Sequence, residues 1–160
     1  MKRYLLVGLI FIFVSAVKAD TTKVLFAGNS YTYVNDLPSL FKNLSSSMGR
    51  NVYTEMSAPG GYTLEQHLTN SETMAKISRG GWNYVVLQEQ SQMPVIEYYR
   101  YTSTYPSARK LDSIIKSYNC STMFFMTWGR RYGGIQCINT FCSPAFVNLS
   151  HMQNSLLSYY

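Results

Sequence analysis

Short apolar runs alternate with amphipathic segments along most of the chain. Four runs rich in apolar, β-branched and aromatic residues each end in a polar or glycine-containing loop, as buried strands do; they are 24–27, 51–56, 82–87 and 122–127. Between and after them, apolar residues recur at helical spacing in segments 37–48, 64–77, 105–118 and 144–160. This alternation predicts a single α/β domain, with a parallel sheet covered by helices on both faces.

Residues that could take part in catalysis follow each predicted strand. They are Ser30, Gly60-Gly61, Gln88–Gln92 and Trp128–Arg131. Parallel strands place the loops at their carboxyl ends on one edge of the sheet, where open α/β sheets bind ligands. A hydroxyl, a flexible backbone donor, carboxamides and a guanidinium would meet there, an assembly typical of a nucleophile with its oxyanion hole. The alternative is that Ser30 only caps a turn.

The N-terminus has the pattern of a secretory signal peptide. A basic start, Met1-Lys2-Arg3, precedes an apolar run over 5–14, and Val17-Lys18-Ala19 has small or allowed residues at the cleavage-determining positions. The pattern predicts a signal peptide over 1–19 and a mature, secreted chain from Asp20; an uncleaved anchor is the alternative. Without the three basic residues of the leader, the formal net charge falls from +6 to +3. No basic cluster with interleaved aromatics remains, so nucleic-acid binding is not expected.

Three cysteines would then lie in an oxidising compartment. Cys137 and Cys142, separated by a short polar loop, are the natural disulfide pair, which leaves Cys120 either buried at a strand start or paired outside this chain. The sequence lacks C-x-x-C, and its two histidines are far apart, so neither a metal site nor a cofactor is expected. Predicted glycosylation sequons stand at Asn43, Asn119 and Asn148.

The blocks after the strands resemble those of the SGNH (GDSL-like) serine hydrolase superfamily. Gly28-Asn29-Ser30 is similar to its first block, Gly60-Gly61 to its second, and Leu87–Ser91 stands where its third usually has Gly-x-Asn-Asp. The resemblance implies a three-layer flavodoxin-like fold with Ser30 as nucleophile. It also implies that Gly61 lends its backbone N–H to the oxyanion. A glutamine would have to replace the asparagine as donor, and Gln88, nearest the strand end, is favoured over Gln90.

The sequence departs from this family in the acid and base. The family carries them on a final Asp-x-x-His after a fifth strand, and neither His67 nor His151 lies in such a motif. We expect His67 on a helix surface or behind the site, and His151 in solvent. Either domain 20–160 lacks its final strand and Asp-x-x-His by truncation, the interpretation we favour, or catalysis has been lost. Truncation would also leave the fourth strand as an unprotected edge.

The expected function is that of a secreted serine esterase. It would hydrolyse a small acyl ester, such as a carbohydrate acetyl ester, through an acyl-Ser30 intermediate. The alternative is a catalytically inactive, secreted carbohydrate-binding or structural glycoprotein, with Tyr31, Tyr62, Trp128 and Tyr132 as sugar platforms. No stable membrane insertion is expected once the leader is cleaved.

Overall fold

The computed structural model describes residues 20–160, in which strands and helices alternate. The strands are β1 (Thr22–Ala27), β2 (Val52–Ser57), β3 (Tyr84–Leu87), β4 (Ser121–Phe124), β5 (Cys137–Ile138) and β6 (Phe141–Cys142). The helices are α1 (Ser30–Tyr33), α2 (Leu37–Ser47), α3 (Leu64–Thr69), α4 (Ser71–Ser78), α5 (Glu97–Tyr99), the π-helical turn η1 (Arg100–Thr104), α6 (Tyr105–Ser117) and α7 (Leu149–Tyr159). The predicted signal peptide, 1–19, lies outside the described residues.

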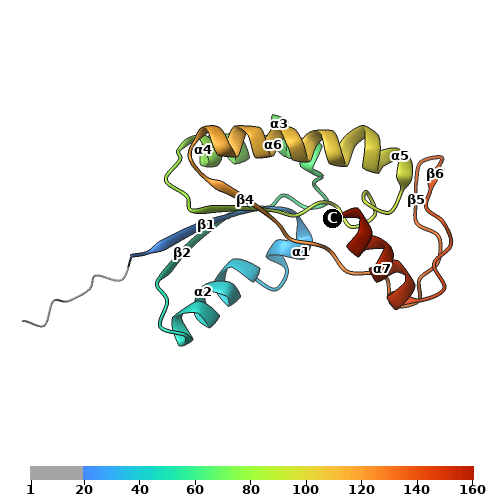
Figure 1. Ribbon diagram of the computed structural model, residues 1–160, viewed down its shortest axis with the longest axis horizontal. Helices are drawn as coiled ribbons and strands as arrows, with labels where there is room; N and C mark the ends of the chain where they lie inside the picture. Colours follow the sequence, from blue (N-terminus) through green and yellow to red (C-terminus); the bar gives the residue numbers. More distant parts are fainter. Residues whose placement is uncertain (1–19) are drawn as a thin grey trace, which may run out of the picture.

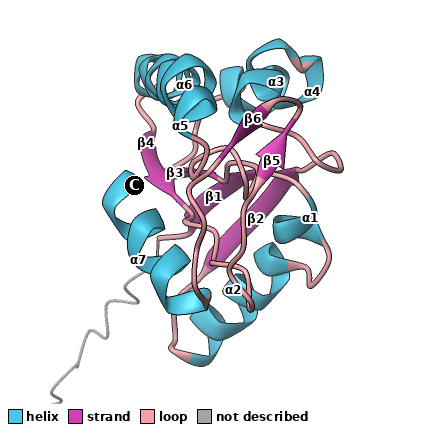
Figure 2. Ribbon diagram, turned by 90° about the vertical axis from the view of Figure 1, so that its right-hand side faces the viewer, coloured by secondary structure: helices cyan, strands magenta, loops and turns pink. Residues whose placement is uncertain are grey.

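Strands β1 to β4 form one parallel sheet in the order β2-β1-β3-β4. Strand β1 is central, with Leu25 beside Glu55 of β2 on one side and beside Val85 of β3 on the other. Helices α3, α4 and α6 cover one face of the sheet, and α1 and α2 lie on the other, with α7 near the carboxyl ends of the strands (Figure 1). Figure 2 looks onto that carboxyl edge. The three-layer α/β fold predicted from the sequence is therefore confirmed.

Two apolar clusters hold these layers together. The larger lies between the sheet and helices α3, α4 and α6, and its fully buried members include Leu25, Val85, Leu111 and Ile115. The smaller joins the segment after β3 to α7 through Val95, Ile96, Phe146, Met152 and Leu156. Helix α7 also packs on the backbone after β4, since a Cβ on Gly129 would lie 2.8 Å from the carbonyl oxygen of Leu149. The loops after β3 and β4 are thus fixed against one helix.

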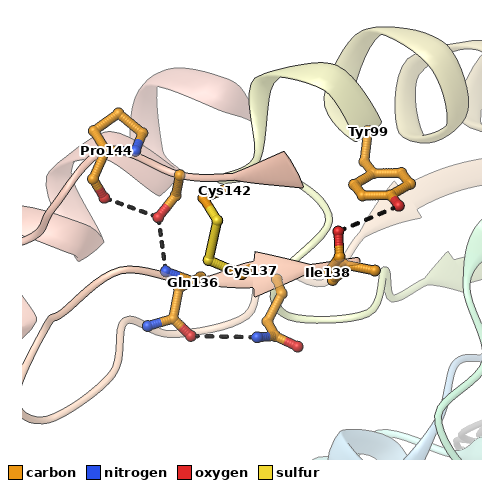
Figure 3. Close-up of a disulfide and its surroundings, with 8 residues drawn as sticks. Tyr99, Gln136, Cys137, Ile138, Cys142 and Pro144 are labelled. Atoms are coloured by element: carbon orange, nitrogen blue, oxygen red, sulfur yellow. Dashed lines mark hydrogen bonds between the residues drawn. A yellow bond between two sulfur atoms is a disulfide. The ribbon is translucent and has the colours of Figure 1, made fainter. Parts of the chain in front are cut away.

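The hairpin β5–β6 carries the predicted disulfide. Cys137 and Cys142 pair across the two antiparallel strands and are bonded to each other (Figure 3). Beside them, the backbone N–H of Gln136 donates to Ser143 Oγ at 2.9 Å. The predicted pairing is confirmed. Cys120 is a free, buried cysteine directly before β4, which is the first of the two arrangements that the sequence left open.

The structure corrects several predicted boundaries. The helix predicted over 64–77 is two helices, because Asn70 ends α3 and its side chain accepts the N–H of Thr73 to begin α4. The third strand begins at Tyr84 and not at residue 82. Asn83 precedes it, and its side chain accepts the N–H of Lys23. The last helix begins at Leu149, where Asn148 is the N-cap. None of the helices in residues 20–160 has the length and apolar character needed to cross a bilayer.

Candidate active site

Ser30 lies directly after β1, as the half-buried first residue of α1. Asn29 is the N-cap of this turn, and its Oδ1 accepts the backbone N–H of Tyr31 at 3.2 Å. The N–H of Ser30 itself donates to no other group among the described residues. Ser30 therefore lies where the sequence places it, with a free backbone donor beside its hydroxyl; its role as a nucleophile stays a prediction.

Gln88, at the end of β3, clamps the turn that carries Ser30. Its Oε1 accepts the backbone N–H of Asn29 and the hydroxyl of Thr32, both at 2.9 Å. Its Nε2 donates to Asn29 Oδ1 at 3.0 Å and to the carbonyl of Glu89 at 2.6 Å. A side chain at Gly28 would collide with this arrangement, since its Cβ would lie 2.6 Å from Gln88 Oε1. Gln88 is buried, and both its N–H groups are engaged within the chain.

The loop after β2 is tied to the same turn. Asn29 Nδ2 donates to the carbonyl of Tyr62 at 2.8 Å, which fixes the segment following Gly60-Gly61. Gly61 is exposed, with φ of +73° and open space where a Cβ would stand. Its N–H donates to no group within residues 20–160. The structure thus leaves a second backbone donor unengaged, close in sequence to a residue that contacts Asn29.

His67, on α3, holds the Ser30 turn from beneath. The imidazole is fully buried, with Nε2 2.9 Å from the carbonyl oxygen of Gly28 and Nδ1 2.8 Å from Thr73 Oγ1. Because a carbonyl can only accept, Nε2 carries the proton and Nδ1 accepts from the hydroxyl. Burial lowers the pKa of His67, and the bond to Gly28 opposes this only in part. Of the two positions expected for His67, the helix surface is wrong, and the structure places it behind the Ser30 turn.

Arg130, in the loop after β4, joins two further loops of this edge. Its Nη1 donates to the hydroxyl of Tyr31 at 3.1 Å, and its Nη2 donates to Ser91 Oγ at 2.9 Å. The ring of Tyr31 lies against that of Trp128, with centroids 4.4 Å apart. Together with the contacts of Asn29, these bonds bring all four loops together, as the parallel sheet predicted.

Glu89 is a buried acid next to this network. Its Oε1 accepts the N–H of Leu64 at 3.0 Å and that of Gln90 at 2.7 Å, whereas its Oε2 has no hydrogen-bond partner among residues 20–160. Burial raises the pKa of Glu89, against the effect of those two N–H groups. Through those two bonds the carboxyl anchors the start of α3 to the end of β3.

Among the described residues, no imidazole hydrogen-bonds to Ser30 and no metal-binding cluster is present. His67 has both ring nitrogens engaged away from the hydroxyl. His151 is exposed, as expected, and its Nδ1 accepts the N–H of Val147 at 3.2 Å. Within 20–160, no three His, Cys, Asp or Glu side chains are grouped so as to hold a metal ion.

Sequence reasoning missed part of this site. It did not foresee that Asn29 would bond to both Gln88 and Tyr62, or that Glu89 would be buried. The weak signal for Asn29 was its place before Ser30 and α1, which is typical of an N-cap. Gln90, the alternative to Gln88, is half-buried, and its Oε1 accepts the N–H groups of Gln92 and Met93. The sequon asparagines 43, 119 and 148 are all exposed.

Comparisons with known proteins bear on the fold. No protein-family model matches the sequence, and neither does any curated protein. Among solved structures, a protein from Slackia heliotrinireducens described as "a putative SGNH hydrolase" is 23% identical, covering 88% of this chain and 72% of its own length, with a TM-score of 0.65. A DUF4886 family protein from Bacteroides uniformis is 18% identical, covering 88% of this chain and 60% of its own length, with a TM-score of 0.59. The chain thus spans less than two thirds of the second protein, and its fold is that of SGNH-like hydrolases.

Proposed function

We propose that this protein is a secreted SGNH-type serine esterase with Ser30 as its nucleophile. The observation that carries the proposal is the convergence of four loops on the Ser30 turn through Asn29, Gln88 and Arg130. A turn cap alone does not need such support, whereas a nucleophile must be held within a fraction of an ångström of its productive position. The disulfide between Cys137 and Cys142 supports secretion.

The reaction would be acyl transfer. Ser30 Oγ forms a bond to the acyl carbon, the ester C–O bond breaks, and the alcohol departs with the proton that Ser30 gave up; water then releases the acid by the same steps. The unengaged N–H groups of Ser30 and Gly61 would stabilise the oxyanion, at about 3 kcal/mol for each donor. For Gln88 to donate as well, its amide would have to give up its bond to Asn29 or to the carbonyl of Glu89.

We infer that the general base comes from elsewhere, because neither His67 nor His151 hydrogen-bonds to Ser30. We therefore propose that an acid and an imidazole from outside residues 20–160 complete the catalytic site. General-base help is worth about 10²–10⁴-fold in rate, so residues 20–160 alone should be nearly inactive. We propose a small acyl ester, such as an acetyl ester of a carbohydrate, as the substrate.

The test begins with the transcript, sequenced past the codon for Tyr160, and continues with expression of the full reading frame from Asp20. Hydrolysis of 4-nitrophenyl acetate is then compared between wild type, Ser30→Ala and Ser46→Ala; Ser46 is an exposed serine on α2. We expect Ser30→Ala to lose at least a hundredfold in rate and Ser46→Ala to match wild type. Equal rates in all three proteins would refute the nucleophile.

A second candidate function rests on a specific observation. No imidazole within 20–160 hydrogen-bonds to Ser30, and Trp128, 50% exposed, offers an aromatic face at the same edge. A secreted protein that binds a carbohydrate without cleaving it would have this combination. A stop codon directly after Tyr160, with sugar binding and no hydrolysis, would favour this function.

A further inference from the structure

Two side chains of the loop after β4 and one from the Ser30 turn form a compact cluster, here called the Arg130 cluster: Tyr31, Trp128 and Arg130. Tyr31 is contacted by both others, through the hydrogen bond from Arg130 and the ring contact with Trp128. Tyr31 directly follows Ser30 in the chain, so the cluster adjoins the nucleophile turn.

The guanidinium of the Arg130 cluster has spare binding capacity. An arginine has five N–H donors, and Arg130 uses two of them, on Tyr31 and Ser91. The ion pairs among residues 20–160 are Lys76–Glu72, Arg79–Glu55 and Lys116–Asp112, so Arg130 has no carboxylate partner there. The buried acid of the same sheet edge, Glu89, uses Oε1 to accept two backbone N–H groups and forms no ion pair with Arg130. The positive charge at this edge is therefore not neutralised.

The aromatic part of the cluster is accessible. Trp128 is 50% exposed, whereas Trp82, the other tryptophan, is buried in the core. Exposed aromatic rings bury the apolar C–H face of a sugar ring, while hydroxyl groups such as that of Tyr31 accept or donate hydrogen bonds at its rim. An aromatic face beside an unpaired guanidinium suits a ring that also carries a carboxylate, because guanidinium and carboxylate form paired, charge-assisted hydrogen bonds.

We propose that the Arg130 cluster is the alcohol-side subsite of the Ser30 site and takes an acidic sugar, with its ring on Trp128 and its carboxylate on Arg130. This inference rests on the proposed function for its place in the reaction. The substrate class would be an O-acyl ester of a uronic acid or of a similar carboxylated sugar. Neutral sugars would stack on Trp128 without the charge-assisted bond and bind more weakly.

The test measures binding rather than turnover, so that it stands apart from the esterase assay. Methyl β-glucuronide and methyl β-glucoside are titrated into the full encoded protein, at constant ionic strength, and tryptophan fluorescence is followed. We expect the glucuronide to bind at least tenfold more tightly. Trp128→Phe should abolish the fluorescence change, and Ser30→Ala should leave the affinity within twofold.

Two arginine variants decide whether the charge is specific. Arg130→Gln should reduce the glucuronide preference to less than twofold, whereas Arg131→Gln, at the exposed neighbouring position, should retain it. Arg130→Lys keeps the charge but not the paired geometry and should give an intermediate preference. Equal affinity for the two sugars, absence of any fluorescence change, or equal losses in both Gln variants would each overturn the proposal. Because these readouts do not require hydrolysis, failure of the esterase assay with preserved glucuronide binding would refute only the catalytic role.

Discussion

His67 offers a direct test of how the Ser30 turn is held. In His67→Ala, the carbonyl of Gly28 loses its partner in a buried environment, which costs about 1–3 kcal/mol. The cavity left by the imidazole adds about 2 kcal/mol. Without the imidazole, the Thr73 hydroxyl can donate its proton to Asn70 Oδ1 and accept from Ser57, so its loss is small. We expect His67→Ala to lower the free energy of unfolding by about 3–5 kcal/mol.

The matched variants are His67→Gln and His151→Ala. The glutamine Nε2 can reach the position of the imidazole Nε2, so His67→Gln should lose only about 1–2 kcal/mol and remain folded. His151 is exposed, and its removal should cost less than about 1 kcal/mol. Urea unfolding followed by circular dichroism measures all three. A His67→Ala variant as stable as His151→Ala would refute the role of the imidazole beneath the turn.

The pH dependence of unfolding adds an independent check. Burial lowers the pKa of His67 in the folded protein, so below pH 6.5 the unfolded chain binds more protons at this residue than the folded one does. The stability contributed by the neutral imidazole is therefore present above about pH 6.5 and is lost as the pH falls through the folded-state pKa. Wild type should lose more stability than His67→Gln over this range; identical slopes would contradict the assignment.

Three further predictions concern other parts of the fold. Burial raises the pKa of Glu89, so its neutral form stabilises the fold below about pH 4.5 and that stability is lost as the pH rises; Glu89→Gln should therefore gain stability relative to wild type at pH 8, measured by urea midpoint. Within residues 20–160, β4 pairs with β3 alone, and its Phe124 is 48% exposed; Phe124→Lys should reduce light scattering of a 20–160 fragment on concentration, whereas Leu44→Lys on α2 should not. Removing the disulfide with Cys137→Ser, in a short loop of sequence separation 5, should cost about 2 kcal/mol in thermal or urea unfolding.

The fold could be predicted from the sequence because its signals are local. Each strand of the sheet is a short run rich in apolar residues that a turn residue ends, and the parallel direction of the strands follows from the helices between them. The break at Asn70 was missed because apolar residues keep helical spacing on both sides of it, and only the bond that its Oδ1 accepts from the N–H of Thr73 reveals a new N-cap. Spacing reports which face is buried, not whether the backbone hydrogen bonds continue.

The site was predictable as a location but not as a network. The strand ends place Ser30, Gln88 and Arg130 on one edge without saying which side chains meet. The bond from Arg130 to Tyr31 spans 99 residues of sequence, and nothing local to either residue signals it. The same holds for Gln88. Its position next to the strand end suggested an amide free to donate to the oxyanion, but that amide bonds to Asn29 instead.

The hydrogen bonds of Asn29 suggest why this edge is organised before any substrate arrives. Asn29 bonds through its backbone N–H and Oδ1 to Gln88 and through its Nδ2 to the carbonyl of Tyr62, and its Oδ1 also accepts the N–H of Tyr31 within its own turn. The turn that carries Ser30 is therefore tied to two other loops and cannot shift without breaking several bonds at once. Below it, His67 fixes the carbonyl of Gly28, the residue just before Asn29. An oxyanion donor or nucleophile fixed in this way needs no reordering during the reaction. Such preorganisation is usually the largest single contribution to lowering the activation barrier. If residues beyond 160 supply the base, they would dock on an edge that is already in place, and the Ser30 turn should keep its geometry whether or not they are present.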